Sequence, residues 1–453
     1  MRKLKSVSFL VLLLFLLTAS GQTARPRRIA VFGSSVAFGT GDETNKEGYT
    51  GLLREMLAPK GWEVFNQSRP GDTTASAATR WTPPQAGPAG NVRYLSTVNP
   101  SYVVLGLALT NEGILEAQTK EAKEAVFKKY ADGLRGFVDR ARQNNIVPIV
   151  GLVYPRMSYT PVEYEYARRM NLLLNSWDVP SVNLMGAIDD GAGRYTVGFD
   201  SDDRHPNAAG HHELFYSFVP SLFEALENGK PRPTRPTGDV GFARITRGTP
   251  ITFEPDQTMH SFAMGITIRA QGDGPVATIQ GTTLVGTPEI KTGGRGATYS
   301  SMTLSTTTNF TALLAVENGK WAYRAPSGAA IVSTIDADQQ WHQILLSHYT
   351  PRGDTLLFID GKLAGRIAGE RFQSRRFMIG GPRQADYKDL LIYRSALNAD
   401  EAAALASGTL LQASLEVYSP LADAEFTAGS AENRAQSLSP VKVALGQVTP
   451  IAR

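Results

Sequence analysis

The stretch RRIAVFGSSVAFGTGD, residues Arg27–Asp42, joins an apolar run to a turn made almost wholly of glycine and serine. The apolar run predicts a buried strand over Ile29–Phe32. Two hydroxyl side chains, Ser34 and Ser35, follow that strand at once. Because ligands of open parallel sheets bind beyond the carboxyl ends of the strands, this turn is the first place to look for a functional site.

Strand and helix patterns alternate along the first half of the chain. We predict strands over Ile29–Phe32, Trp62–Asn66, Tyr102–Leu107, Ile146–Val153 and Val179–Leu184. We predict helices over Tyr49–Leu57, Glu121–Gln143, Pro161–Trp177 and Ala208–Leu226. This rhythm predicts an α/β domain with a mostly parallel sheet and helices on both faces.

A proline- and glycine-rich stretch, ENGKPRPTRPTGDVG over Glu227–Gly241, interrupts this rhythm. Proline fixes φ and removes a backbone donor, so the stretch is typical of a semi-rigid spacer. After it come short alternating runs with hairpin signals at Asn318-Gly319, Arg352-Gly353 and Asp360-Gly361, which predict an all-β sandwich.

These patterns give the domain organisation. We predict a signal peptide over residues 1–21, an α/β domain over 27–227, a linker over 228–240, a β domain over 241–407 and a C-terminal tail over 408–453. The tail is too apolar for a disordered segment, so we expect it to pack across one of the two domains.

The first residues, MRKLKSVSFLVLLLFLLTASGQTA, have the cationic, apolar and small-residue regions of a secretory signal peptide. The apolar run over Val7–Leu17 is too short to span a bilayer, and a short membrane anchor is the alternative. No cysteine near the cleavage region is available to carry a lipid. We therefore expect an exported protein, periplasmic or extracellular, whose mature chain is not inserted in a membrane.

The composition bears on partners and on stability. The formal net charge is +4, and removal of the leader with its cations Arg2, Lys3 and Lys5 leaves the mature chain close to neutral. A near-neutral chain argues against nucleic acid as the partner. The chain has no cysteine, so the exported fold must be stabilised by apolar burial rather than by disulfides.

Residues suited to ester hydrolysis follow the first three strands and precede the last helix. Ser35 follows the first strand, and a serine hydroxyl becomes a nucleophile when a base such as His205 takes its proton. Asp202, three residues earlier, can hold the imidazole tautomer. The backbone N–H groups of Ser35 and Gly71, with the side-chain amide of Asn111, would stabilise an oxyanion, and glycine at 71 lets the backbone come close.

These four blocks resemble those of the SGNH or GDSL hydrolase family over roughly residues 27–227. The resemblance implies an α/β three-layer sandwich with a flavodoxin-like parallel sheet, and the hydrolysis of carboxylic esters. No cofactor is required, because a serine hydrolase carries its own nucleophile and base. The roles that the resemblance implies are nucleophile for Ser35, base for His205, orienting carboxylate for Asp202, and oxyanion hole for Gly71 and Asn111.

Two positions depart from the family pattern. Ser34 stands where the family has aspartate, which removes a carboxylate beside the nucleophile, and Ser34 is itself an alternative nucleophile. Glu112 follows Asn111 where the family usually has aspartate, and we expect the oxyanion hole to persist. The departures indicate a divergent subgroup, so the substrates of better-known members are not carried over.

Ordinary structural roles are the competing interpretation of these residues. Ser35 follows a strand, where serine often caps a helix, and Asn207 can cap the helix that begins after His205. His211 and His212 lie inside that helix, and we expect them to pack or to face solvent. The carboxylates Asp200, Asp202 and Asp203 could bind a cation with His205. No second histidine lies at ligand spacing, so we expect no metal.

The chain over Trp341–Leu405 resembles the concanavalin A-like, laminin-G-type jelly roll, and the resemblance extends over about residues 251–406. The motifs that carry it are Trp341-His342, Phe358–Gly361, Ile379-Gly380-Gly381, Asp389–Tyr393 and the closing SALNADE. Such folds bind carbohydrate, bind protein or are structural. Aromatic residues that could stack on sugars, or instead fill the core, are Trp321, Tyr323, Trp341, Tyr349 and Tyr387. Calcium, as in some relatives, would have as candidate ligands Asp360, Asp386 and Asp389, although hairpin turns also explain them.

We therefore expect a secreted serine esterase that hydrolyses carboxylic esters, chiefly O-acetyl groups on a polysaccharide or glycoconjugate. The ester chemistry comes from the site, and the carbohydrate comes from the appended jelly roll. One alternative is a lipid or short-chain esterase with a structural β domain. Another is a catalytically inactive carbohydrate-binding protein, which Ser34 would explain, but the complete set of Ser35, Asp202 and His205 counts against it.

Overall fold

The computed structural model describes residues 25–85, 90–238, 241–270, 272–292, 298–422, 426–427, 429–444 and 446–451. The predicted signal peptide, residues 1–21, and residues 239–240 of the predicted linker lie outside the described residues. Across the described part of the chain, no helix is both long enough and apolar enough to cross a membrane.

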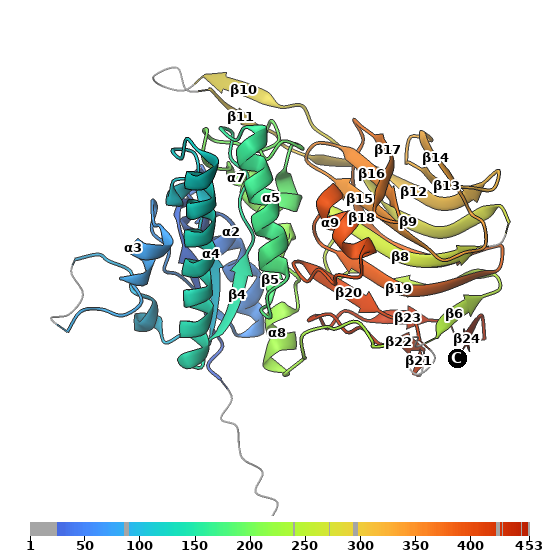
Figure 1. The fold of residues 1–453 in the computed structure, drawn as a ribbon, viewed down its shortest axis with the longest axis horizontal. Helices are drawn as coiled ribbons and strands as arrows, with labels where there is room; N and C mark the ends of the chain where they lie inside the picture. Colours follow the sequence, from blue (N-terminus) through green and yellow to red (C-terminus); the bar gives the residue numbers. More distant parts are fainter. Residues whose placement is uncertain are drawn as a thin grey trace, which may run out of the picture.

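The first domain is built on a parallel sheet. Among the described residues five strands form it, in the order β2-β1-β3-β4-β5 (Figure 1). Their bounds are β1 Arg28–Gly33, β2 Glu63–Asn66, β3 Tyr102–Gly106, β4 Val147–Gly151 and β5 Ser181–Val182. The residues of β3 are all buried, as expected for a parallel strand covered on both faces. The predicted α/β sandwich is confirmed.

Helices cover both faces of this sheet. On one face α3 (Thr74–Ala78), α4 (Lys120–Gln143) and α5 (Pro161–Asn175) share a core with it. On the other face lie α2 (Gly48–Leu57), α7 (Ala208–Tyr216) and α8 (Leu222–Glu227). The single helix predicted over 208–226 is wrong, because the chain breaks between α7 and α8, where Pro220 has no N–H to continue a helix. The short helices α1 (Ser35–Phe38) and α6 (Met185–Ile188) follow β1 and β5.

The second domain is a sandwich of antiparallel sheets. Within the described residues one sheet has the order β14-β13-β12-β9-β18-β7-β23-β22-β21 and the other the order β17-β16-β15-β8-β19-β6-β24, with β20 paired to β19. The bounds in the first sheet are β7 Gly248–Phe253, β9 Gly274–Val285, β12 Ser305–Glu317, β13 Lys320–Arg324, β14 Ala330–Asp336, β18 Arg371–Gly381, β21 Phe426–Thr427, β22 Ser430–Ala431 and β23 Val441–Val443. Those in the second are β6 Phe242–Ile245, β8 Phe262–Ala270, β15 His342–Tyr349, β16 Asp354–Ile359, β17 Lys362–Ile367, β19 Ala385–Tyr393, β20 Leu415–Ser419 and β24 Val448–Ile451.

The structure shows the predicted hairpin turns and the position of the predicted C-terminal tail. The turns at Asn318-Gly319, Arg352-Gly353 and Asp360-Gly361 join consecutive antiparallel strands, as predicted. The predicted tail, residues 408–453, contributes strands to both sheets, since β23 pairs with β7, and β24 pairs with β6. The sandwich therefore continues beyond residue 407, and the closing helix α9 (Ala399–Ala406) lies between its strands in sequence.

The two domains meet across a close interface. The Gly186 carbonyl accepts a hydrogen bond from the Ala396 N–H at 3.1 Å, and the Ser395 hydroxyl donates to the Asn183 carbonyl at 2.8 Å. A Cβ on Gly186 would lie 2.1 Å from the Ala396 oxygen, so only glycine permits this approach. Buried Ala413 of the second domain joins the helix core of the first.

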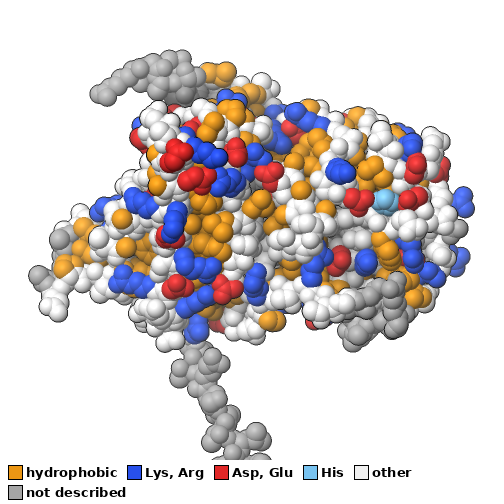
Figure 2. All heavy atoms as spheres, in the orientation of Figure 1, with side chains coloured by type: hydrophobic (Ala, Val, Ile, Leu, Met, Phe, Trp, Pro, Cys, Tyr) orange, Lys and Arg blue, Asp and Glu red, His pale blue; other side chains and the backbone are white. Residues whose placement is uncertain are grey.

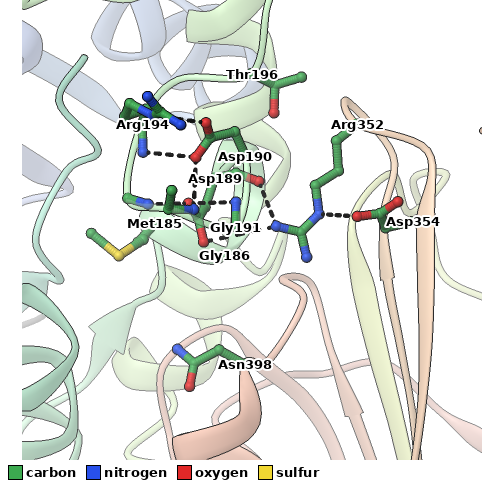
Figure 3. A network of polar contacts seen from close by, with 12 residues as sticks. Met185, Gly186, Asp189, Asp190, Gly191, Arg194, Thr196, Arg352, Asp354 and Asn398 are labelled. Atoms are coloured by element: carbon green, nitrogen blue, oxygen red, sulfur yellow. Dashed lines mark hydrogen bonds and ion pairs between the residues drawn. The ribbon is translucent and has the colours of Figure 1, made fainter. Parts of the chain in front are cut away.

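An arginine of the second domain reaches into a turn of the first (Figure 3). Arg352, between β15 and β16, donates to the Asp189 carbonyl at 3.1 Å and pairs with Asp354 at 2.9 Å. Burial raises the pKa of Asp189. On the face drawn in Figure 2, basic and acidic side chains lie next to one another over α4 and α5, where Arg169 pairs with Glu124.

A buried ion pair lies next to this interface, where Arg394 Nη1 donates to the Tyr216 carbonyl of the first domain at 3.5 Å, and it gives a stability prediction. Arg394 and Glu416 have fully buried side chains 2.5 Å apart, and Arg394 also donates to the Gln257 carbonyl. We expect Arg394→Met to lower the free energy of unfolding by about 3–5 kcal/mol, because it leaves the Glu416 carboxylate buried and unpaired. Lys442→Met, which removes an exposed pair with Glu254, should cost about 1 kcal/mol or less in the same urea titration. Equal losses in both variants would contradict the assignment.

Candidate active site

The segments that follow β1, β2, β3 and β4, together with the loop before α7, line one pocket of about 540 Å³. Its lining is Ser35, Thr40, Pro70, Gly71, Thr110, Asn111, Glu112, Gly113, Leu115, Glu116, Arg156, Arg204 and His205. The structure thus brings four of the five predicted site residues to one cavity. The fifth, Asp202, lies behind His205.

His205 and Asp202 are joined by a close hydrogen bond. His205 Nδ1 lies 2.8 Å from Asp202 Oδ2, while the backbone N–H groups of Arg204 and His205 donate to Oδ1 at 2.7 and 2.8 Å. Burial acts to raise the pKa of Asp202, but the bonds from His205 and from the backbone outweigh it and hold this pKa below its usual value. An ionised carboxylate beside Nδ1 favours the tautomer that carries its proton there, which leaves Nε2 free to accept a proton.

The two adjacent serines point to different places. Ser34 is fully buried, its N–H donates to the Gly106 carbonyl at 3.0 Å, and its Oγ has no hydrogen-bond partner among the described residues. Ser35 begins α1, is half-buried and lines the pocket. Only Ser35 is therefore placed, within the described structure, to meet a molecule in this pocket.

Gly71 and Asn111 come from neighbouring loops. Gly71 has φ of +82°, and an added Cβ would meet no atom within 4 Å. The left-handed backbone favours glycine there, and the close approach of this backbone to an oxyanion stays a prediction. Asn111 lies in a short 3-10 turn after β3, and its Nδ2 donates to the Asp72 carbonyl at 2.9 Å. That bond fixes the Asn111 amide beside the loop that carries Gly71.

Sequence reasoning missed two carboxylates that hold these loops. Asp72 is fully buried and pairs with Arg80, and also with Arg69 at 3.1 Å. Glu112, which in the sequence is only a departure from the family pattern, accepts a hydrogen bond from the Thr74 N–H at the start of α3. An acidic residue directly after each functional residue, Gly71 and Asn111, was the available signal.

The glycines after Ser35 allow a crowded turn. Gly39 and Gly41 have φ of +94° and +95°, and a Cβ on Gly41 would lie 2.2 Å from the Pro206 carbonyl oxygen. The turn after Ser35 therefore presses against the loop that carries His205. His211 supports the turn from α7, because its Nε2 lies 3.1 Å from the Thr40 carbonyl oxygen.

The structure also shows the surroundings of Asn207 and of the candidate metal ligands. Asn207 caps α7, as anticipated, by accepting from the Gly210 N–H at 2.8 Å. In the described ranges, no three histidine or acidic side chains are grouped to share a metal ion. In the β domain Asp386 pairs with Arg244 and Arg269, each at 2.7 Å, and calcium binding there stays a prediction.

The packing of His211 predicts an acid sensitivity. His211 is buried, and burial lowers its pKa to about 4, whereas an unfolded histidine titrates near 6.5. The unfolded state alone gains the proton between these values, so stability is lost as the pH falls from about 6.5 towards 4. We expect His211→Gln to reduce the loss of unfolding free energy between pH 7 and pH 5 by about 2 kcal/mol, measured by urea titration.

His342 is a control of opposite sign. Burial acts to lower its pKa, but bonds with Asp338 and Asp360 outweigh it, and the pKa is raised. His342→Gln should therefore make the acid-induced loss larger. A His211→Gln variant that loses as much stability as the wild type between these pH values would refute the role given to His211.

Comparison with known proteins gives a family match over the residues of this pocket. Residues 31–213 match the model of the GDSL-like lipase/acylhydrolase family. A search of curated proteins found no match. Among solved structures, the chain is similar to a psychrotrophic esterase from Pseudoalteromonas sp., with 18% identity and a TM-score of 0.31 over 42% of this chain and 92% of that one.

Two further solved structures are similar to the chain. A GDSL-like lipase from Bacteroides thetaiotaomicron has 14% identity and a TM-score of 0.32, over 46% of this chain and 92% of that one. An acetyl-xylooligosaccharide esterase from Geobacillus has 17% identity and a TM-score of 0.30, over 42% of this chain and 90% of that one. The family match covers the N-terminal domain with Ser35, Gly71, Asn111 and His205, and it supports a carboxylic-ester hydrolase.

Proposed function

We propose that the protein is a secreted serine esterase that removes small acyl groups, chiefly O-acetyl groups, from a polysaccharide or glycoconjugate. The observation that carries the proposal is the single pocket lined by Ser35, Gly71, Asn111 and His205, with Asp202 bonded behind the histidine. Export is proposed from the leader over residues 1–21.

The geometry supports a two-step acyl transfer. His205 Nε2 takes the proton of Ser35 Oγ as that oxygen attacks the ester carbonyl carbon. The oxyanion that forms accepts hydrogen bonds from the Ser35 and Gly71 N–H groups and from Asn111 Nδ2, which has a second hydrogen beside the one given to Asp72. The ester C–O bond then breaks, and the imidazolium gives its proton to the leaving alkoxide.

Water completes the cycle. His205 takes a proton from a water molecule that attacks the acyl-serine carbonyl, and the same donors stabilise the second oxyanion. The bond to Ser35 Oγ breaks, the serine regains its proton, and a carboxylic acid leaves. Asp202 stabilises the imidazolium in both steps and keeps its own charge, in agreement with its lowered pKa.

The pocket lining favours a small acyl group on a polar alcohol. Charged side chains at its walls include Glu112, Glu116, Arg156 and Arg204, whereas Leu115 is its one aliphatic lining side chain besides Pro70 in the described structure. A long acyl chain needs an apolar channel to gain from burial. Sugar hydroxyls instead find donors and acceptors here.

The second domain offers one aromatic residue for sugar contact. Of the five named aromatic residues, Trp321, Tyr323, Tyr349 and Tyr387 are buried in the sandwich. Trp341 is only half-buried, and its ring lies 4.8 Å from the Arg269 guanidinium and 4.5 Å from the Lys388 ammonium. Carbohydrate binding by this domain is therefore proposed for the Trp341 region.

The nucleophile is tested by two neighbouring substitutions. Ser35→Ala should lower kcat for 4-nitrophenyl acetate by about 10³-fold or more, because it removes the attacking oxygen. Ser34→Ala should keep activity within about threefold, since its hydroxyl faces the core. Activity that survives in Ser35→Ala and disappears in Ser34→Ala would overturn the assignment.

Acyl-chain preference tests the substrate class. We expect kcat/KM for 4-nitrophenyl acetate to exceed that for the octanoate by about tenfold or more, because a polar pocket gains nothing from added methylenes. A preference for the octanoate would favour the lipid esterase. Release of acetate from an acetylated xylan, measured beside Ser35→Ala, then tests the polymer directly.

A further inference from the structure

A two-stranded arm of the β domain crosses to the first domain. Strands β10 (Glu289–Thr292) and β11 (Thr298–Ser301) form it, between β9 and β12 in sequence. Figure 1 shows this arm extending away from the sandwich and over the end of the α/β domain near α7. Its final strand brings Ser300 against the loop that carries Asp202 and His205.

The His205 loop is a narrow hairpin with two stems. Asp200 and Pro206 form a bridge across it, and the Ser201 N–H donates to the His205 carbonyl at 2.9 Å. The Asn207 N–H donates to the Phe199 carbonyl at 3.1 Å. The apex beyond the bridge holds Asp202 and His205, so the position of the stems sets the position of the imidazole.

Ser300 bonds to the first stem. Its Oγ accepts from the Gly198 N–H at 2.6 Å and donates to the buried carboxyl group of Asp200. Its own N–H donates to the Asp200 carbonyl at 3.3 Å. One serine therefore satisfies three polar groups of that stem.

Ser300 also bonds to the second stem. Its carbonyl accepts from Asn207 Nδ2 at 2.7 Å, and the same Nδ2 donates to the Gly198 carbonyl at 2.9 Å. The residue thus joins the two stems that the bridge of Asp200 to Pro206 brings together. Asn207 Nδ2 also donates to the Asp200 carbonyl at 3.4 Å, so the first domain ties its own stems, and Ser300 adds further links to both stems from the second domain.

Apolar packing fixes the base of the arm on the same spot. Gly198 has φ of +101°, and an added Cβ would lie 2.7 Å from Met302 Cβ. Met302 is buried and belongs to the core of the first domain with Tyr195 and Phe199. A side chain at 198 would push the arm away from the loop.

From these contacts we propose that Ser300 is a positioning residue for the esterase site, and that the second domain is thereby part of the catalytic unit. The inference rests on the proposed function. It assigns no chemistry to Ser300 itself, whose atoms act through the loop that holds Asp202 and His205. It also gives the arm a role separate from any carbohydrate binding by the sandwich.

The test is the full-length mature protein with Ser300→Ala, Ser300→Thr and the exposed control Ser305→Ala. We expect Ser300→Ala to lower kcat for 4-nitrophenyl acetate by about 10- to 100-fold with KM changed by less than about threefold, because a displaced base slows chemistry more than binding. Ser300→Thr keeps the hydroxyl. Its kcat should therefore lie at least halfway, on a logarithmic scale, from that of Ser300→Ala to that of the wild type. Ser305→Ala should match the wild type.

A second variant tests the same contact in case Ser300→Ala has a folding defect. Asn207→Ser keeps an N-cap acceptor for α7 but removes the donor to the Ser300 carbonyl, and it should lower kcat in the same manner. All variants are compared as folded protein, judged by circular dichroism and the unfolding midpoint. Wild-type kcat in both Ser300→Ala and Asn207→Ser, with only a lowered midpoint, would overturn the inference and leave the proposed function standing. A wild-type protein without esterase activity would overturn both.

Discussion

The parallel alignment of β1, β2 and β3 is the constraint on which the rest of the site depends. Parallel strands end at one edge of the sheet, so the loops that follow them must meet there. β1 and β3 stay paired to their last residues, where Gly33 lies opposite Gly106, and a Cβ on Gly33 would be 2.1 Å from the Gly106 oxygen. That approach delivers Ser35 to the pocket and turns Ser34 into the core.

The proposed base, His205, reaches this pocket by a different route. His205 lies on a hairpin outside the sheet, and strand pairing does not fix its position. Hydrogen bonds from Ser300 and packing from Met302, both of the second domain, hold the stems of that hairpin. The position of Ser35, the proposed nucleophile, is thus determined by the first domain, while we infer that the position of His205, the proposed base, depends on both domains.

The sequence predicted what local patterns encode. Strand rhythm and four short blocks placed Ser35 and His205 in one pocket, and turn chemistry located the hairpins of the sandwich. Contacts between distant segments left no such signal. The arm joins Ser300 to Asp200 across a hundred residues, and the last strand pairs with β6 near the start of the sandwich. The helix break before α8 had a local signal in Pro220, but the apolar pattern on either side concealed it.

The most direct test of the account is the site of covalent labelling by a fluorophosphonate, which reacts with an activated serine. Trypsin should release Ile29–Lys46, which contains both adjacent serines, and fragmentation of that peptide distinguishes Ser34 from Ser35. The account predicts one added group, on Ser35, and no labelling in Ser35→Ala. Labelling of Ser34, or of neither serine in protein that hydrolyses esters, would contradict it.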